Sequence, residues 1–488
     1  MNIADYAERD AVALAALVRS GQVSAVEVTE AAIGAIEALD PALNALVLQD
    51  VERARERARR VRRDLPLSGV PFLIKDIGVY TEEWPTTMSS RFFLDAAARP
   101  DSEIVKRWRA AGTVFLGKTN TPEFADDFVT EPALRGATLN PWNPALSVGG
   151  SSGGAAAAVA SGMVPVAHGS DVGGSIRVPA ACCGLFGLKP SRGLNPAGPY
   201  VAEAGGGLNC EHVLTRSVRD SAAFLDATAG PEPGAPYRVL RPVHSYLEAL
   251  DRPLGRRRIV CLTRRLDGAA VAPEIDGKLA EAAALLEGLG HEVVPGRFPA
   301  AVAAAAAGDG WAALWMIDIV TAVEERAAEL GRPPGPDDLE RLAQHIIRRV
   351  APMSAAGYMA VRRIAHRVTL TMAREFERFD FLMTPTTSTL PPPLGSVDGN
   401  SPVFDFDRWV SAAYGFAPFT EIFNVTGQPA ASLPLFQSAS GMPIGIQLVG
   451  RQDQDHELLR LAADLERATG WTQRHPPSWA GRSREPAG

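Results

Sequence analysis

Short apolar runs alternate with amphipathic segments along most of the chain. Runs at 69–76, 112–120 and 164–171 have the length and composition of buried strands, and the segment 101–112 between two of them repeats apolar residues at helical spacing. Strands that alternate with helices form sheets covered on both faces. The pattern therefore predicts an α/β fold, a mixed central sheet with helices on both faces. Further elements are predicted at 256–263 (strand), 272–290 (helix), 291–294 (strand), 379–395 (strand and proline-rich loop), 442–450 (strand) and 456–470 (helix).

The same pattern divides the chain into three parts. Residues 1–65 carry helical periodicity and are predicted to pack on the core as an N-terminal helical segment. Residues 66–475 are predicted to form one large domain, with a helical insert at about 300–380 that lies over a cleft. The last residues, 476–488, offer little to pack and are predicted to be an unstructured tail.

Composition excludes several classes of partner. The chain of 488 residues carries 49 basic and 56 acidic side chains, a net charge of −7, without a basic patch that would attract nucleic acid or anionic lipid. No secretory signal is recognised at the N-terminus, and the apolar stretches are shorter than the roughly 20 residues that span a bilayer, so we expect a cytoplasmic protein. The four cysteines lack CxxC spacing, which favours reduced core thiols without a metal or other cofactor.

Two serines set among glycines are the main candidates for chemistry. Ser151 lies in GGSSGG and Ser175 in SDVGGS, 24 positions apart (175 − 151). Glycine allows the backbone to turn tightly, expose a hydroxyl and direct N–H groups at a developing oxyanion, which acyl transfer requires. The N–H groups of Val172, Gly173 and Gly174, with that of Ser175, are predicted to form this oxyanion hole.

The general base is predicted to be a lysine. Lys75 ends the apolar strand VPFLI, where desolvation favours the neutral amine and lowers its pKa. A neutral lysine can accept a proton from a serine hydroxyl. Two histidines lie near the serine segment. His168 is interpreted as packing at the end of a strand, and His212 as a structural hydrogen-bonding residue where the chain enters a helix.

The motifs together resemble those of the amidase signature family of serine hydrolases. GVPFLIKD, GKTNTPEFA, GGSSGG, GSDVGGSIRVPAACCGLFGLKPSRG and GMPIGIQLVG resemble family segments in the family's order, densely over about 65–230 and thinly over about 380–465. Within the family, the segment 205–230 and the chain length are similar to amidases that act on nylon-type cyclic oligoamides and to aryl acylamidases. Ala155 stands where many members have serine, which removes no group of the proton relay.

The resemblance implies a mechanism and its residues. It implies that the protein hydrolyses the amide bond of a small molecule through an acyl-enzyme, with an esterase side activity. It also implies a Ser-cisSer-Lys triad, in which Ser175 is the nucleophile, Ser151 is the bridging serine with a cis peptide bond, and Lys75 is the base. Ser152, Asp171 and Arg177 are implied to brace the two serine loops.

The substrate is not fixed by these motifs. We expect the cleft to be lined by residues of the 300–380 insert and of the loop at 124–128, with Asp126 or Asp127 binding an amine; the candidate substrate-binding residues are Phe124, Asp127, Gly149, Gly150, Trp311 and Trp315. Two alternatives remain open: a glutamine-hydrolysing amidotransferase subunit, which would need a partner, and a catalytically silent binding protein. A homodimer is also compatible with the sequence.

Overall fold

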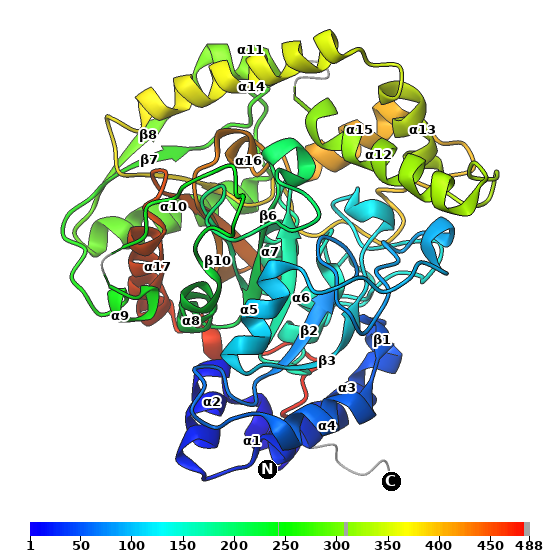
Figure 1. Ribbon diagram of the computed structural model, residues 1–488. Helices are drawn as coiled ribbons and strands as arrows, with labels where there is room; N and C mark the ends of the chain where they lie inside the picture. The colour runs from blue at the N-terminus through cyan, green and yellow to red at the C-terminus, as the bar shows by residue number, and fades with distance from the viewer. Residues whose placement is uncertain (243, 307–310, 483–488) are drawn as a thin grey trace.

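The computed structural model describes residues 1–242, 244–306 and 311–482, and these contain one mixed β-sheet at the centre of the molecule (Figure 1). Its strands follow the order β1-β3-β2-β4-β6-β5-β10-β11-β9-β7-β8. The strands are β1 Leu46–Gln49, β2 Pro71–Lys75, β3 Val114–Thr119, β4 Val166–Asp171, β5 Phe186–Lys189, β6 Cys210–Thr215, β7 Arg258–Leu262, β8 Glu292–Gly296, β9 Phe381–Pro385, β10 Ala430–Gln437 and β11 Pro443–Val449.

Parallel and antiparallel pairs both occur in the sheet. Strand β2 runs parallel to β3 and β4, and β7 runs parallel to β8 and β9. The strands between these two groups pair antiparallel: β4 with β6, β6 with β5, β5 with β10, β10 with β11, and β11 with β9. The parallel register places Lys75 beside Thr119, and the antiparallel pairing of β4 with β6 places Asp171 beside Cys210. The ends of β2 and β4 thus carry the lysine and the serine loop to the same part of the sheet.

Helices cover both faces of the sheet, which confirms the predicted α/β class. Helices α6 and α7 pack on one face, while α8, α10 and α17 share a core with strands β5, β9, β10 and β11 on the other. The α-helices are α1 Ile3–Ala7, α2 Ala11–Ser20, α3 Ala25–Leu43, α4 Val51–Arg60, α5 Glu103–Ala111, α6 Gly153–Ala160, α7 Arg177–Cys183, α8 Val218–Thr228, α9 Tyr246–Ala249, α10 Pro273–Gly288, α11 Ala300–Ala306, α12 Ala313–Leu330, α13 Arg341–Val350, α14 Ala355–Glu375, α15 Phe406–Phe416, α16 Ile422–Thr426 and α17 Asp455–Thr469.

The two helical groups outside the sheet lie at opposite ends of the molecule. Helices α1 to α4 gather at the N-terminal end, and α11 to α15 at the other (Figure 1). Helix α3 begins at a capping box in which Ser24 and Glu27 satisfy each other's backbone N–H groups. Helix α12 contacts the 3₁₀ turn Ala204–Gly207, and this contact brings it over the ends of β4 and β6.

The structure corrects the expectation for the chain ends in two places. Residues 46–49, within a region expected to be helical, form the edge strand β1, which pairs antiparallel with β3. Residues 476–482 do not form a loose tail: Trp479 is 5% exposed and its indole stacks on His475, while the Ala480 N–H donates to the Ser161 carbonyl at 2.8 Å. One large aromatic side chain is enough to anchor a segment rich in proline and glycine. The remaining tail, 483–488, lies outside the described residues.

No helix within the described residues is long and apolar enough to cross a membrane. The four cysteines are buried and unpaired, and no group of three or more His, Cys, Asp or Glu side chains in the described ranges is arranged to hold a metal ion.

Candidate active site

Lys75 lies at the end of β2 with its amine against two serines. The five residues of β2 are all buried, and Lys75 is fully buried itself. Its Nζ lies 2.8 Å from Ser151 Oγ and 3.0 Å from Ser170 Oγ. A neutral amine has two N–H donors and one lone pair. Donation to Ser170 therefore leaves the lone pair free to accept from Ser151.

The pKa of Lys75 fits this arrangement. Burial lowers the pKa of Lys75 to about 7, against the opposing charges of Glu211 and Asp171, which raise it. Two other lysines are buried, but the Lys118 amine is paired with the Asp76 carboxylate at 2.7 Å and the Lys189 amine donates to the Pro190 carbonyl at 2.8 Å. Neither of them is hydrogen-bonded to Ser151, whereas Lys75 is. Lys75 is therefore the lysine poised to exchange a proton near neutral pH.

Ser151 and Ser152 form the turn that leads into helix α6. The Gly150–Ser151 peptide bond is cis. Ser151 is fully buried, and the Ser152 N–H donates to the carbonyl of Ser175 at 3.1 Å, while Ser152 Oγ donates to the carbonyl of Ser170 at 3.3 Å. Ser152 thus ties the turn of Ser151 to the loop of Ser175.

The loop of Ser175 presents unpaired backbone donors. No hydrogen bond runs from the N–H groups of Val172, Gly173, Gly174 or Ser175 to any group in the described part of the chain. Most buried N–H groups in proteins are paired, so a run of free donors beside a cavity is suited to an anion. Gly174 has a φ of 141°, and a Cβ there would lie 2.3 Å from Thr420 Oγ1, so only glycine fits.

A buried ion pair between Arg177 and Asp171 stabilises the loop of Ser175. Arg177 Nε and Nη2 bind the two oxygens of Asp171 at 2.9 and 2.7 Å, and both side chains are fully buried. Burial alone would raise the pKa of Asp171, but the charge and hydrogen bonds of Arg177, with a hydrogen bond from Asn424, lower it to about 2. The Asp171 carboxylate also accepts from the Ile176 N–H at 3.1 Å, directly after the nucleophile candidate. The pair therefore fixes the backbone on both sides of Ser175.

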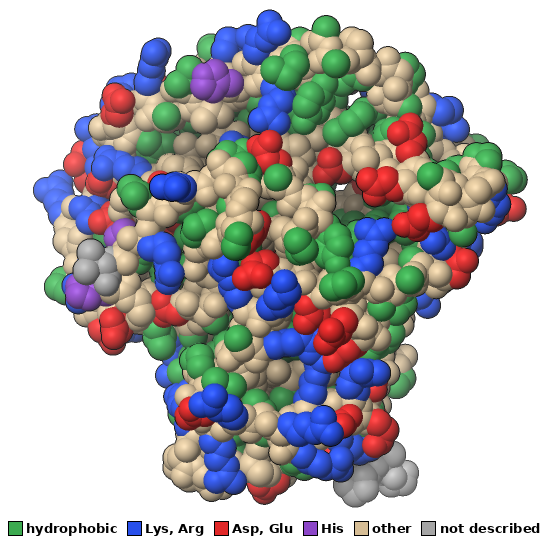
Figure 2. Space-filling model, viewed as in Figure 1, with side chains coloured by type: hydrophobic (Ala, Val, Ile, Leu, Met, Phe, Trp, Pro, Cys, Tyr) green, Lys and Arg blue, Asp and Glu red, His purple; other side chains and the backbone are tan. Residues whose placement is uncertain are grey.

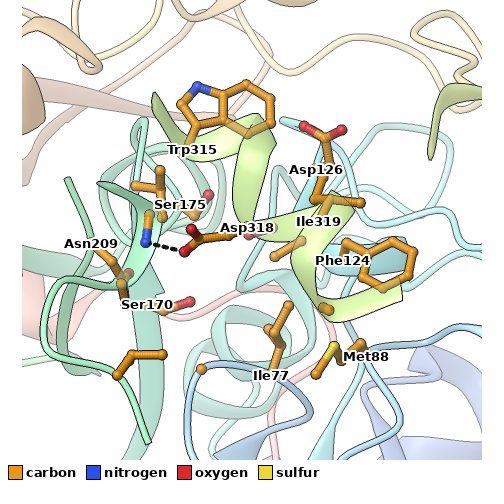
Figure 3. A pocket seen from close by; sticks show the side chains of 18 of the residues that line it. Ile77, Met88, Phe124, Asp126, Ser170, Ser175, Asn209, Trp315, Asp318 and Ile319 are labelled. Atoms are coloured by element: carbon orange, nitrogen blue, oxygen red, sulfur yellow. Dashed lines mark hydrogen bonds between the residues drawn. The ribbon is translucent and has the colours of Figure 1, made fainter. Parts of the chain in front are cut away.

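Ser151, Ser170 and Ser175 border a cavity of about 450 Å³, a size typical of small-molecule sites. Figure 3 shows Ser170 and Ser175 on one side of it, with the apolar side chains of Ile77, Met88, Phe124 and Ile319 facing them. Helix α12 contributes Trp315, Asp318 and Ile319 to the wall.

The predicted substrate residues divide into two groups. Phe124, Asp127 and Trp315 line the cavity. Gly149, Gly150 and Trp311 do not: the glycines pack against Pro179 and Val129, and Trp311 is buried in a cluster with Leu208 and Phe423. The expectation for these three residues is wrong because their neighbours within the core fill the space around them.

The two histidines are structural in their contacts. His168 is fully buried on β4; its Nδ1 accepts from the Lys75 backbone N–H at 3.3 Å and its Nε2 lies 2.7 Å from the Glu211 carboxylate. Since Nδ1 accepts, the proton is on Nε2 and is donated to Glu211. His212 bonds Ser221 Oγ at 2.8 Å from strand β6, not from the start of a helix as expected.

Three residues of the site were missed by sequence reasoning. Ser170 is the second hydrogen-bond partner of the Lys75 amine, and Glu211 carries the charge that raises the pKa of Lys75. Glu421 has its carboxyl on the cavity wall. Only Ser170 carried a local signal, because it adjoins Asp171 in the GSDVGGS segment.

The comparisons with known proteins agree over nearly the whole chain. The sequence model of the Amidase family matches residues 27–459. The 6-aminohexanoate-cyclic-dimer hydrolase of Paenarthrobacter ureafaciens is 36% identical over 477 residues, 96% of each chain. The putative amidase AmiC of Mycobacterium tuberculosis is 38% identical over 476 residues, 96% of this chain and 97% of the relative.

Solved structures show the same relationship. The structure of a 6-aminohexanoate cyclic dimer hydrolase complexed with substrate has a TM-score of 0.91 at 36% identity and covers 97% of this chain and 99% of its own. A bacterial aryl acylamidase of the amidase signature family has a TM-score of 0.87 at 31% identity with the same coverage. The chain therefore belongs to the amidase signature family and is an amidase.

Proposed function

We propose that the chain hydrolyses the carbon–nitrogen bond of a small-molecule amide through an acyl-enzyme on Ser175, with Ser151 as proton relay and Lys75 as general base. The observation that carries this proposal is the buried Lys75 amine at 2.8 Å from Ser151 Oγ. Ser151 borders the same cavity as Ser175, whose loop has unpaired N–H groups. A base, a relay and an oxyanion site then surround one reacting carbonyl.

Acylation follows from the positions of these groups. Neutral Lys75 takes the proton of Ser151, and Ser151 takes that of Ser175 as Ser175 Oγ bonds to the carbonyl carbon. The negative charge on the carbonyl oxygen is received by the N–H groups of Val172, Gly173, Gly174 and Ser175. The intermediate then collapses: the C–N bond breaks, and the Lys75 proton passes back through Ser151 to the leaving nitrogen.

Deacylation reverses the roles of the same groups. A water molecule gives its proton to Ser151 and onward to Lys75 while its oxygen bonds to the ester carbon. The C–O bond to Ser175 breaks, Ser175 recovers a proton through the relay, and a carboxylic acid leaves. Water enters in place of the amine, so a linear amide gives one amine and one carboxylic acid, and a cyclic amide opens to one molecule that carries both groups.

The substrate class proposed is a small amide with apolar parts, linear or cyclic. The apolar wall of Ile77, Met88, Phe124, Ile319 and Trp315 supports this, as does the likeness to a hydrolase of a cyclic amide and to an aryl acylamidase. The test is a panel of aliphatic, aryl, peptide and lactam amides, with esters for comparison. Hydrolysis by the purified chain alone supports the proposal; no turnover without a partner protein favours an amidotransferase subunit.

Activity is expected to rise with pH. Because only the neutral lysine accepts a proton and the pKa of Lys75 is about 7, kcat/KM rises through neutral pH and levels off on the alkaline side. The measurement is kcat/KM for a neutral amide from about pH 5.5 to 9, a range that brackets this pKa. A profile that is flat, or that falls across this range, contradicts a lysine base.

Removing the charge of Glu211 is expected to move this profile. Glu211→Gln keeps an oxygen to accept from His168 Nε2 but removes the negative charge that raises the pKa of Lys75. The midpoint of the rise should move toward lower pH, by up to about one unit for a buried neighbouring charge.

The control for this prediction is Glu325→Gln. Glu325 lies on the same cavity, is exposed, and has no part in the pKa shift of Lys75. Its replacement should leave the midpoint in place. A midpoint that moves upward in Glu211→Gln, or moves equally in both variants, would rule out Glu211 as the charge that tunes the base.

A further inference from the structure

The cavity has far more acidic than basic groups on its wall. Among the described lining residues, Arg99 is the one basic side chain, whereas Asp126, Asp127, Glu203, Asp318, Glu325 and Glu421 are acidic. Figure 2 shows acidic side chains around the hollow beneath α12. A concave surface of one sign attracts ligands of the opposite sign. The hydrolysis of a neutral amide uses none of these six carboxyls.

One of them is buried without a partner. Asp126 is 8% exposed, its Oδ2 is buried without a hydrogen bond, and no described residue donates to its carboxyl. Figure 3 shows its side chain among those that line the cavity. A buried polar group without a partner is rare and costly in a folded protein. Its position on a ligand cavity therefore points to a partner that arrives with the substrate.

Two neighbouring carboxyls are held in place by aromatic donors. The Trp409 indole N–H donates to Asp127 Oδ2 at 3.0 Å, and the Trp315 indole N–H donates to Glu421 Oε1 at 3.0 Å. The hydroxyl of Tyr414 donates to the same Glu421 oxygen at 3.3 Å. Asp126, Asp127 and Glu421 are here called the acidic wall. Their indole and phenol neighbours add ring faces, which attract cations.

The charges around Asp126 are all of one sign. The groups that act on it are Asp127, Glu123 and Glu421, and no basic side chain offsets them. Burial and these carboxyls raise the pKa of Asp126 well above its usual range, and burial raises the pKa of Asp127 to about 8. A bound cation would favour the ionised form of both.

The acidic wall lies close to the reacting centre. A Cβ placed on Gly173 would be 3.6 Å from Glu421 Cγ and 3.7 Å from Phe128 Cζ, so the wall adjoins the loop that ends in Ser175. The backbone leading to Asp126 also adopts left-handed angles at two consecutive non-glycine residues, Phe124 (φ 52°) and Ala125 (φ 60°), a costly conformation that concentrates at functional sites.

Building on the proposed hydrolysis, we infer that the acidic wall binds a positively charged ammonium group of the substrate, with Asp126 as its main contact. The substrate class is then an amide that carries a primary ammonium a few bonds from the scissile carbonyl. Asp127 contributes less to binding the ammonium, because its two oxygens already accept hydrogen bonds, one from the Trp409 indole N–H and one from the Phe128 N–H at 2.7 Å.

The test compares matched amides that differ by one charge. In the first pair the ammonium is on the acyl part: 3-aminopropanoyl 4-nitroanilide is the charged amide and butanoyl 4-nitroanilide the neutral one. In the second pair the ammonium is on the amine part: N-(3-aminopropyl)butanamide is the charged amide and N-butylbutanamide the neutral one. For each, the ratio of kcat/KM for the charged over the neutral amide is measured. We expect a ratio above one for at least one pair in the unmodified chain, and a fall of about tenfold or more in Asp126→Asn, the loss expected for a charge-assisted hydrogen bond.

The matched control is Glu324→Gln, because Glu324 is exposed on α12 and is not on the cavity wall. Its ratio should stay within about twofold, as surface charges contribute little. The inference is overturned if neither pair shows a preference for the charged amide, or if the preference persists in Asp126→Asn.

A binding measurement separates this inference from the hydrolysis itself. Calorimetric titration of Ser175→Ala with butylammonium, and with butan-1-ol for comparison, needs no turnover. Tighter binding of the ammonium than of the alcohol, lost in Ser175→Ala combined with Asp126→Asn, supports the subsite; equal binding of the two overturns it. Absence of turnover on every amide tested, charged or neutral, would refute the proposed hydrolysis and leave this binding result standing.

Discussion

Replacing Ser175 with alanine is expected to abolish amide hydrolysis, lowering kcat by about 10⁴-fold or more, as removal of a nucleophile does in other serine hydrolases. The reason is that the acyl-enzyme has no other oxygen on which to form: Ser151 lies on the lysine amine, and Ser170 Oγ accepts from that amine at 3.0 Å. The measurement is kcat on the best amide of the panel, with the amount of folded protein checked by circular dichroism.

The control for this substitution is Ser161→Ala, which removes a buried serine hydroxyl at the end of α6, away from the cavity. It should retain nearly full activity. The assignment of the nucleophile is wrong if Ser175→Ala keeps more than about one hundredth of the activity, because an enzyme that has lost its nucleophile does not retain that much.

Replacing Lys75 with alanine is expected to lower kcat/KM by about 10² to 10⁴-fold, the range for loss of a general base. The substitution removes the group that accepts the proton of Ser151, and no other described side chain offers a neutral amine at that point. The rise of activity through neutral pH should disappear at the same time, because its titrating group is gone. The measurement is the pH profile of the residual activity.

Two further variants show which property of Lys75 matters. Lys75→Arg keeps the positive charge but cannot lose it near neutral pH. It should therefore be as inactive as Lys75→Ala if the neutral amine is the base. Ser151→Ala should fall into the same range, since it interrupts the relay between Lys75 and Ser175. An active Lys75→Arg variant would contradict the role of base and favour a purely electrostatic one.

Much of the fold could be predicted from the sequence because local patterns and long-range packing agree there. Strand β2, whose five residues are all buried, reads as a continuous apolar run, and the core helix α6 reads as a run of alanines. Strand β6 does not show such an apolar run, because its sequence CEHVLT places Glu211 and His212 at buried positions. Each of these two side chains can be buried only because it has a hydrogen-bond partner. Those partners, His168 and Ser221, come from other elements and are invisible to a local pattern.

The site shows the same division. Lys75, Ser151 and Ser175 stand in distinctive motifs, and the structure brings all three to one place. The wall of the cavity depends instead on which helix crosses it: Trp315 faces the cavity, whereas Trp311, four residues earlier in the sequence, is buried in the core beside Leu208. Glu421 reaches the cavity from a segment 246 residues after Ser175 (421 − 175), and no sequence spacing predicts that contact.

The most direct test of the central claim is the site of covalent labelling by a fluorophosphonate, which reacts with an activated serine. Intact-protein mass spectrometry followed by peptide mapping should find a single adduct, on Ser175, formed faster as the pH rises through the pKa of Lys75 near 7. Ser175→Ala should take up no label under the same conditions. An adduct on another residue, or equal labelling of Ser175→Ala, would contradict the assignment of Ser175 as the nucleophile.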